Sequence, residues 1–264
     1  WAGKDTQTAY LAYFFPLNYV RNLKVCEELK ARDFAAQVGR LLDFGFGLGS
    51  GYLAARDTGL IAPSTPVHAV DSSDIPLKIF DKFLREPDDD ITYDSRPPAA
   101  NNFDLAIFSY SLNEVAEADW ILQIPRLLIV EPSTQFNGRR LMECRHALIQ
   151  HGFNIWAPCT HRKDCPLLVH SKTDWCHDRV HWTPPAWWKR LEAVLPIKNQ
   201  TLTLSYLAAG RSSSLASPQA FTPGRVVGDE LKEKGKSRWL YCRGDEREFL
   251  SWLQRSAKSP EIHR

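Results

Sequence analysis

The stretch Arg40-Leu41-Leu42-Asp43-Phe44-Gly45-Phe46-Gly47-Leu48-Gly49-Ser50-Gly51 carries the strongest structural signal in the sequence. A short apolar run ends in closely spaced glycines, and residues 52–58 have the composition of a helix. Glycine lets the backbone turn sharply and lets a ligand approach the main chain where a Cβ atom would clash. The pattern therefore predicts a strand, a turn and a helix, with Gly45, Gly47 and Gly49 facing a ligand.

An acidic residue stands one strand–helix unit later. Residues 67–70 form a second buried-strand candidate that ends in Asp71, and residues 75–84 favour a helix. A carboxylate at this position can accept hydrogen bonds from the ribose diol of a nucleotide-like ligand. The glycine loop with Asp43 before it, together with Asp71, resembles the first two motifs of class I methyltransferases, which implies S-adenosylmethionine as cofactor. A dinucleotide-binding oxidoreductase, or a degenerate fold that binds nothing, would look similar.

Strand and helix patterns alternate through the middle of the chain. Further strands are expected at residues 103–110, 126–130 and 153–157, with helices at 113–124 and 139–151. Such alternation implies a parallel sheet. At the front, residues 6–32 have apolar side chains at helical spacing, and Pro16 predicts a break into two short helices. Later in the chain, residues 201–209 and 238–242 indicate two more strands, the second being the last.

Two polar residues follow the fourth strand candidate. Asn113 and Glu114 lie where strand ends meet a ligand crevice, so we expect them to bind the cofactor, although Glu114 could instead be an ordinary helix-capping or loop acid. Glu131 follows the next strand and is better explained as an ordinary loop residue. No residue has the pattern of a methyl-transfer base, and no Asn-Pro-Pro-Tyr-like element is present. The sequence therefore assigns no catalytic residue.

The length and the charge distribution of the chain limit its domain organisation and the partners it could bind. The chain has 264 residues, 44% of them hydrophobic, which suits one large α/β domain with an elaboration. No uninterrupted apolar run reaches the roughly 18 residues of a membrane span. Residues 1–134 hold 12 Lys/Arg and 19 Asp/Glu, a balance of −7, whereas residues 135–264 hold 21 and 12, a balance of +9. This asymmetry suggests a face that meets phosphate, although a solvated surface explains it equally well.

The chain contains six cysteines, and four of them suggest an inorganic site. Without a secretory signal, cysteines favour thiols or metal ligands over disulfides. Cys159, Cys165 and Cys176 lie in an irregular segment, and Cys242 follows at the end of a strand. Four thiolates could hold a tetrahedral zinc or an iron–sulfur cluster, and the spacing favours neither. His161 and His177 are alternative ligands, and buried unliganded cysteines are a further alternative.

These motifs together resemble the mitochondrial small-ribosomal-subunit methyltransferase-like assembly-factor family, which has bacterial members. The resemblance spans nearly the whole chain and is carried by these elements: Ala9-Tyr10-Leu11-Ala12-Tyr13, Ala157-Pro158-Cys159-x-His161, Cys165-Pro166-Leu167, Trp175-Cys176-His177, Leu204-Ser205-Tyr206-Leu207, Gly224-Arg225-Val226-Val227-Gly228 and Cys242. It implies a methyltransferase-like Rossmann fold, association with the small subunit and its RNA during assembly, and a 4Fe-4S cluster. The implied ligands are Cys159, Cys165, Cys176 and Cys242. Phe46 and Leu48 depart from the first motif, where methyltransferases usually carry small residues or proline.

The expected fold is α/β: a class I methyltransferase Rossmann-like sheet with N-terminal helices and a cysteine-rich, cluster-binding carboxyl-terminal elaboration. We place the helices in residues 1–40, the S-adenosylmethionine-type core in 41–157, and the cluster-binding region that completes the sheet in 158–264. The alternatives to a ribosome-assembly role are an active RNA methyltransferase and a small-molecule methyltransferase with a structural zinc. We expect a monomer off the ribosome, in a bacterial cytoplasm or else a mitochondrial matrix. Because the chain opens at Trp1 rather than Met, we expect upstream residues to be missing.

A basic, aromatic surface is expected in the carboxyl half. Arginine and lysine would contact phosphates and tryptophan would stack on bases, although the tryptophans could equally form local core around the metal. The candidates are Arg139, Arg140, Arg162, Lys163, Arg179, Lys189, Arg190, Trp175, Trp182, Trp187 and Trp188.

Overall fold

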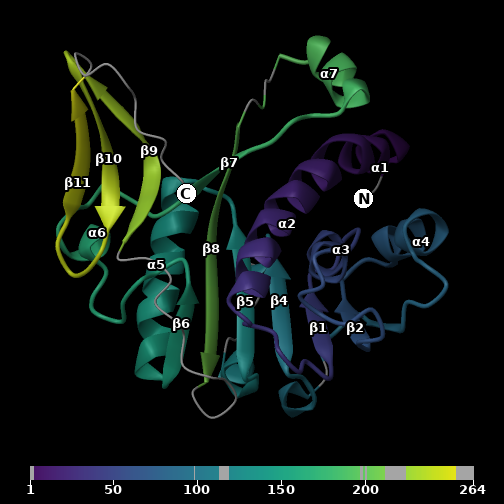
Figure 1. The fold of residues 1–264 in the computed structure, drawn as a ribbon. Helices are drawn as coiled ribbons and strands as arrows, with labels where there is room; N and C mark the ends of the chain where they lie inside the picture. The colour runs from purple at the N-terminus through teal and green to yellow at the C-terminus, as the bar shows by residue number, and fades with distance from the viewer. Residues whose placement is uncertain are drawn as a thin grey trace.

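The computed structural model describes residues 3–97, 99–112, 119–196, 199, 201–211 and 224–253. Its main feature is a large sheet flanked by helices (Figure 1). In spatial order the strands are β3 (Ile91–Asp94), β2 (Val67–Val70), β1 (Leu41–Phe44), β4 (Leu105–Ser109), β5 (Arg126–Glu131), β8 (Thr201–Arg211) and β6 (Phe153–Ala157), and β7 (Asp178–His181) pairs with β8. The first five strands are parallel, as predicted, but β8 runs antiparallel to β5, β6 and β7, so the sheet is mixed.

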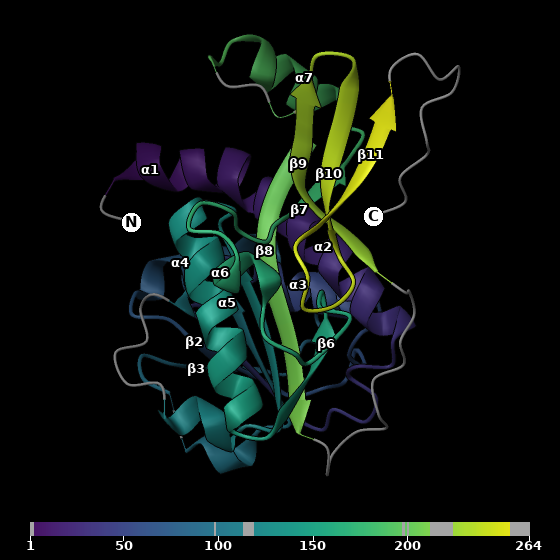
Figure 2. The same cartoon turned by 90° about the vertical axis from the view of Figure 1, so that its left-hand side faces the viewer.

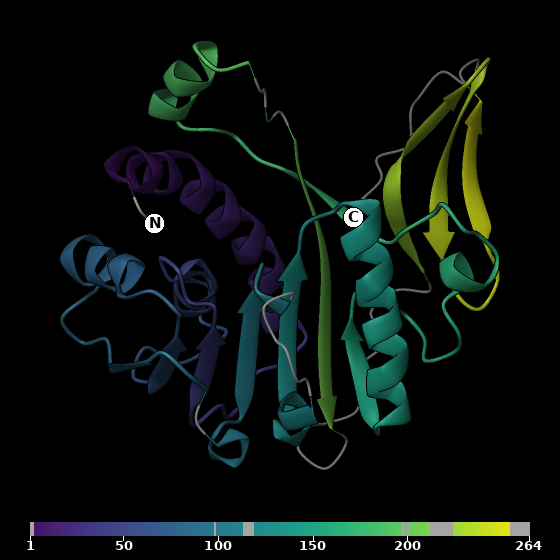
Figure 3. The ribbon, with the colours of Figure 1, turned by 180° about the vertical axis from the view of Figure 1, so that it is seen from behind.

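Helices cover both faces of this sheet, and its central strands β1, β2, β4 and β5 are therefore almost wholly buried. Every residue of β2 and β5 is buried. One core cluster joins the sheet to α2 (Phe15–Ala31), α3 (Ser50–Asp57) and α4 (Asp74–Phe83). A second cluster on the opposite face joins it to α5 (Gln135–Gln150) (Figure 3). Because strand side chains alternate between faces, neighbours such as Leu41 and Leu42 belong to different clusters.

The amino-terminal helices differ from the prediction. Instead of two helices separated at Pro16, the chain forms one continuous helical run: α1 (Lys4–Ala9), a π-helical turn η1 (Tyr10–Phe14) and α2. Pro16 lies in the first turn of α2 but within the continuous run, where a proline has no N–H to donate to the preceding turn. The widened turn therefore stands directly ahead of the proline.

The carboxyl-terminal region contains a second, three-stranded sheet with the order β11-β10-β9. Its strands are β9 (Arg225–Glu233), β10 (Lys236–Cys242) and β11 (Glu248–Leu253). The strand predicted at 238–242 is therefore β10, but it is followed by β11 and is not the last. This sheet lies beside α5, away from β1–β3 (Figures 1 and 2).

The remaining elements are short. They are η2 (Ala100–Asn102), η4 (Asp119–Gln123), α6 (Pro166–Val169) and α7 (Ala186–Ala193). The helix predicted at 113–124 lies partly outside the described residues, and its final part is the 3-10 turn η4. Within the described ranges, no helix has both the length and the apolar character needed to cross a membrane.

Candidate nucleotide pocket and cysteine-lined cavity

A pocket of about 850 Å³ opens at the carboxyl ends of the parallel strands. Gly45 follows β1, Asp71 follows β2, Ser109–Ser111 end and follow β4, and Pro132–Thr134 follow β5. Strand order reverses between β1 and β4, and ligands of open α/β sheets bind in the crevice at such a switch point. The volume lies within the range of small-molecule sites.

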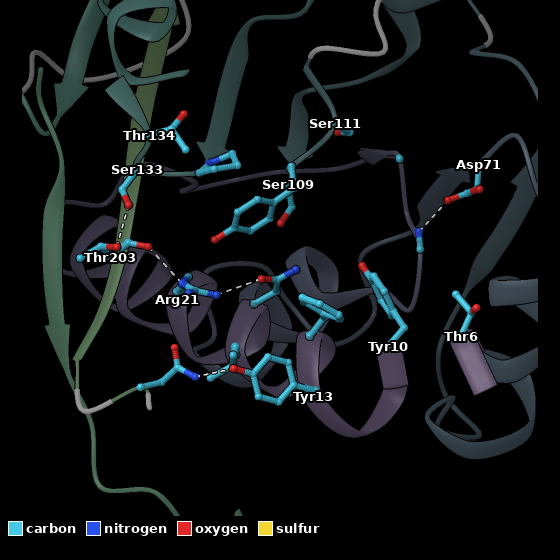
Figure 4. A pocket seen from close by; sticks show the side chains of 18 of the residues that line it. Thr6, Tyr10, Tyr13, Arg21, Asp71, Ser109, Ser111, Ser133, Thr134 and Thr203 are labelled. Atoms are coloured by element: carbon cyan, nitrogen blue, oxygen red, sulfur yellow. Dashed lines mark hydrogen bonds between the residues drawn. The ribbon is translucent and has the colours of Figure 1, made fainter. Parts of the chain in front are cut away.

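The glycine loop forms one wall of this pocket, and Asp71 fixes its shape. Gly45, Gly47 and Gly49 all have positive φ, at 71°, 54° and 71°. The Asp71 carboxylate accepts hydrogen bonds from the Gly47 N–H at 2.8 Å and the Ser73 N–H at 2.9 Å (Figure 4). A Cβ atom on Gly45 would lie 2.3 Å from the Ser111 Cβ. The glycines therefore let the main chain turn tightly at this wall and leave it free of side chains.

The predicted cofactor residues fall into three groups. Gly45, Gly47 and Asp71 line the pocket, whereas Gly49 caps α3 behind them. Asp43 is almost fully buried beneath the loop, where it accepts a hydrogen bond from the Tyr52 N–H at 2.9 Å. The third group, Asn113 and Glu114, lies outside the described residues.

Burial is the main influence on the pKa of the Asp43 carboxyl. Burial, with a smaller contribution from the nearby charge of Asp71, raises the pKa of this carboxyl to about 8, against the hydrogen bond from the Tyr52 N–H. Phe46 and Leu48, the two departures from the first motif, are also buried. The Phe46 ring packs edge-on against Phe80 at 5.0 Å, so it fills the core behind the loop.

The opposite wall comes from the amino-terminal helical run, which the sequence did not connect with the site. The residues it contributes are Thr6, Tyr10, Tyr13, Phe14, Leu17, Asn18 and Arg21. Arg21 is fixed by hydrogen bonds from Nε to the Thr203 carbonyl and from Nη1 to the Asn18 Oδ1, both 3.1 Å. Among the described lining residues, Arg21 is the sole cation and Asp71 the sole anion, and they lie on opposite sides (Figure 4).

A second, smaller cavity gathers the four cysteines expected to act together. Cys159, Cys165, Cys176 and Cys242 all line it, as does His161. Cys242, at the end of β10, thus lies close to the irregular segment, although it follows Cys176 by 66 positions in the sequence. Cys26 and Cys144, the other two cysteines, do not line this cavity.

The Arg145 side chain of α5 donates hydrogen bonds to residues around this cavity. Its buried guanidinium donates from Nε to the Cys159 Sγ at 3.1 Å, and from Nη2 to the carbonyls of His161 and Lys163 at 2.7 and 2.9 Å. The His161 Nε2 and the Cys242 Sγ are 3.6 Å apart. One arginine therefore holds both a thiol and the loop that carries it.

Burial is also the main influence on the thiols. It raises the pKa of Cys159 and of Cys176 above the ordinary value, and it raises that of Cys242 to about 12. The neighbouring cysteines contribute to these raised pKa values, because like charges in one cavity repel. Among the residues the structure describes, no group of three or more His, Cys, Asp and Glu side chains has the arrangement of a metal-ion site.

The strand order, with β8 antiparallel between β5 and β6, defines an α/β methyltransferase-like fold. The family described as mitochondrial small ribosomal subunit Rsm22 matches residues 4–252. The chain belongs to this family, and the resemblance seen in the sequence is confirmed.

Solved methyltransferase structures are also similar. A candidate RNA methyltransferase from Pyrococcus horikoshii is 11% identical, with 73% of this chain and 81% of that chain covered and a TM-score of 0.42. A candidate S-adenosylmethionine-dependent methyltransferase from Listeria monocytogenes is 16% identical, with 72% and 99% covered and a TM-score of 0.39. The 16S rRNA methylase ArmA is 14% identical, with 69% and 84% covered and a TM-score of 0.36. Among curated protein sequences, none matches the chain.

Proposed function

We propose that this protein associates with the small ribosomal subunit, binds its RNA during assembly and holds S-adenosylmethionine in the pocket at the carboxyl ends of β1, β2, β4 and β5. The observation that carries the proposal is the pairing of the glycine loop with Asp71 at that pocket, in a chain of the Rsm22 family. The basic carboxyl half supports an RNA partner.

The residues present suit this cofactor. The Asp71 carboxylate keeps acceptor positions for a ribose diol beyond the two N–H groups it already binds. Gly45 and Gly47 leave the main chain open to the ligand, and Arg21 places a cation where a carboxylate of the ligand would be neutralised. When bound, S-adenosylmethionine supplies an activated methyl group.

We further propose that Cys159, Cys165, Cys176 and Cys242 hold a 4Fe-4S cluster, with zinc as the alternative. Four thiols in one cavity form a suitable donor set for either. The hydrogen bond from Arg145 to the Cys159 Sγ favours negative charge on that sulfur. A cluster here would stabilise the loop from Cys159 to Cys176 and anchor it to β10.

Two measurements test the cofactor and the reaction. Calorimetry with S-adenosylmethionine should show one site per chain, and no binding would overturn the pocket assignment. Incubation with labelled S-adenosylmethionine and small-subunit RNA then separates an active methyltransferase, which labels the RNA, from a silent assembly factor, which does not. RNA affinity should fall steeply with salt, because phosphate contacts release counterions. A small-molecule enzyme would retain no RNA.

The inorganic centre has its own test. An anaerobic absorption spectrum with iron, sulfide and zinc analysis should show a broad band near about 400 nm and about four irons per chain. A colourless protein with one zinc per chain would show that the cysteines bind zinc and not an iron–sulfur cluster. A chain purified anaerobically with neither metal would overturn both.

A further inference from the structure

The four tryptophans of the carboxyl half have different environments. Trp175 belongs to the region of the cysteines: its Nε1 donates to the Ser133 carbonyl at 2.7 Å and its ring stacks on His177 at 5.2 Å. Trp187 and Trp188 belong to α7, and the Trp182 ring meets the Trp188 ring at 5.5 Å. α7 lies on the opposite side of the molecule from α6 and β10 (Figure 1). Trp188 is fully buried, whereas Trp187 is 46% exposed.

A chain of ring contacts connects the exposed tryptophan to the nucleotide pocket. Trp187 meets Trp188 edge-on at 5.5 Å, and Trp188 stacks on Tyr13 of η1 at 5.1 Å. Tyr13 in turn meets Phe14 edge-on at 5.2 Å. Phe14 is 51% exposed, and both Tyr13 and Phe14 line the pocket. The two exposed rings thus pack against a stacked pair formed by the fully buried Trp188 and the partly buried Tyr13.

Positive charge accompanies the exposed rings. Arg190 stands three residues after Trp187 on α7, a spacing that places both on one helix face. Lys189 and Arg190 are exposed, and neither forms an ion pair with a carboxylate of the described residues. The Glu192 carboxylate accepts a hydrogen bond from the Asn199 N–H at 2.6 Å.

Two other basic candidates, Arg139 and Lys163, are already engaged within the protein. Arg139 donates to the Ser171 and Asp174 carbonyls, and Lys163 pairs with Asp245. Lys189 and Arg190 of α7 differ from these two residues because neither forms an ion pair with a carboxylate of the described residues.

We propose that Trp187, Phe14 and Arg190, here named the aromatic ledge, bind single-stranded RNA at the mouth of the nucleotide pocket. Successive bases stack on Trp187 and Phe14, and Arg190 contacts the phosphate between them. Exposed aromatic rings stack on any unpaired base, whereas the bases of a duplex are already stacked and their faces are covered. The inference rests on the proposed RNA-binding function and assigns its location and substrate class.

Area and charge favour RNA over a protein partner. A specific protein interface buries about 1,600 Å² in total, whereas two aromatic side chains supply about 150–250 Å² each. The adjacent cations suit a phosphate backbone more than an apolar protein surface. The edge of the pocket adjoins Phe14, so a strand on the ledge would pass the cofactor site.

The test is fluorescence anisotropy with a labelled single-stranded RNA of about 12 nucleotides, and with the same sequence as a duplex. We expect Trp187→Ala and Phe14→Ala to weaken single-strand binding by about 5- to 100-fold each and to change duplex binding little. Trp187→Phe should retain most of the affinity. Arg190→Ala should lower the slope of log K against log salt by about one. Phe83→Ala is the matched control, because Phe83 is 61% exposed with Lys82 over its ring at 4.9 Å.

The outcomes separate this inference from the proposed function. If the wild-type protein binds the RNA and Trp187→Ala binds it equally well, the ledge is not the site, and the RNA-binding function stands. If the wild-type protein binds neither probe, both ideas fail. Loss of self-association in Trp187→Ala, with RNA affinity unchanged, would assign the ledge to a second copy of the chain. Unchanged thermal melting of the variants shows that the fold is retained, as exposed positions should allow.

Discussion

Arg225 of β9 and Glu28 of α2 form a two-point salt bridge, with Nη1 to Oε1 at 2.8 Å and Nη2 to Oε2 at 3.0 Å. Arg225 also pairs with Asp178 of β7, and the Tyr206 hydroxyl donates to the Glu28 Oε2 at 2.6 Å. Burial tends to raise the pKa of Glu28, but the charge and hydrogen bonds of Arg225 hold it below the ordinary value. The small sheet is thereby fastened to the long helix that forms the pocket wall.

Removing this arginine should destabilise the protein. In Arg225→Met, Asp178 and Glu28 would lose a largely buried cation, and we expect the free energy of unfolding to fall by about 3 kcal/mol. Urea unfolding measures the change. Arg243→Met is the control, because the Arg243–Glu248 pair is exposed and should contribute little. A loss no larger than that of the control would show that the fastening is unimportant.

The same pair has a pH signature. Since the folded pKa of Glu28 is lowered, its contribution is complete above the unfolded pKa of about 4.3 and is lost as the pH falls through the folded pKa. Glu28→Gln should therefore cost less stability, relative to wild type, in acid than at neutral pH. A cost that is constant with pH would contradict this sign.

Asp71→Asn should weaken S-adenosylmethionine binding by about 10- to 100-fold, because a charged acceptor for the ribose diol becomes a neutral one. The amide oxygen can still accept a hydrogen bond from the Gly47 N–H, so the loop should persist. Calorimetry on both proteins measures the change. Asp74→Asn, an exposed position on α4, should leave the affinity unaltered. Equal affinity of wild type and Asp71→Asn would remove Asp71 from the cofactor site.

The sequence predicts the elements whose signal is local. The glycine loop, β1 and β2 follow from an apolar run ended by residues that only a turn tolerates. β3 was missed because it is a short edge strand in which only Ile91 is buried, so no apolar run marks it. β9 was missed because its second half is charged and mostly exposed, in a sheet beyond the main core.

The site was predicted only in part, for a physical reason. The local strand–turn–helix pattern, with the strand that follows it, is enough to predict Gly45, Gly47 and Asp71 as site residues. Tyr10 and Arg21 reach the same pocket through packing of the helical run across the strand ends, and helical periodicity marks a helix without showing what its polar face meets. The convergence of Cys242 on the other cysteines likewise depends on tertiary pairing. The cysteine content suggested a shared site, and the family resemblance named these four residues as its ligands.

Cys176→Ser should lower the iron content and the thermal stability of the anaerobically purified protein, because a lost ligand removes folding free energy that the proposed centre supplies. Cys144→Ser is the matched control: Cys144 is a partly buried cysteine of α5 that does not line the cavity. Iron analysis and melting curves on both variants decide. Unchanged metal content in Cys176→Ser would show that this ligand assignment is wrong.

The buried carboxyl of Asp43 predicts an opposite pH dependence from Glu28. Its folded pKa is raised to about 8, so between about pH 4 and pH 8 the folded protein binds a proton that the unfolded chain has released. Stability from this group therefore falls as the pH rises through that interval. Asp43→Asn keeps an acceptor for the Tyr52 N–H and removes the titration. Its stability relative to wild type should grow by about 1 kcal/mol or more from pH 5 to pH 8, measured by urea unfolding. Asp74→Asn, whose exposed carboxyl has a lowered pKa, should show no such growth. A flat difference for Asp43→Asn would mean that the carboxyl is ionised beneath the glycine loop throughout this range.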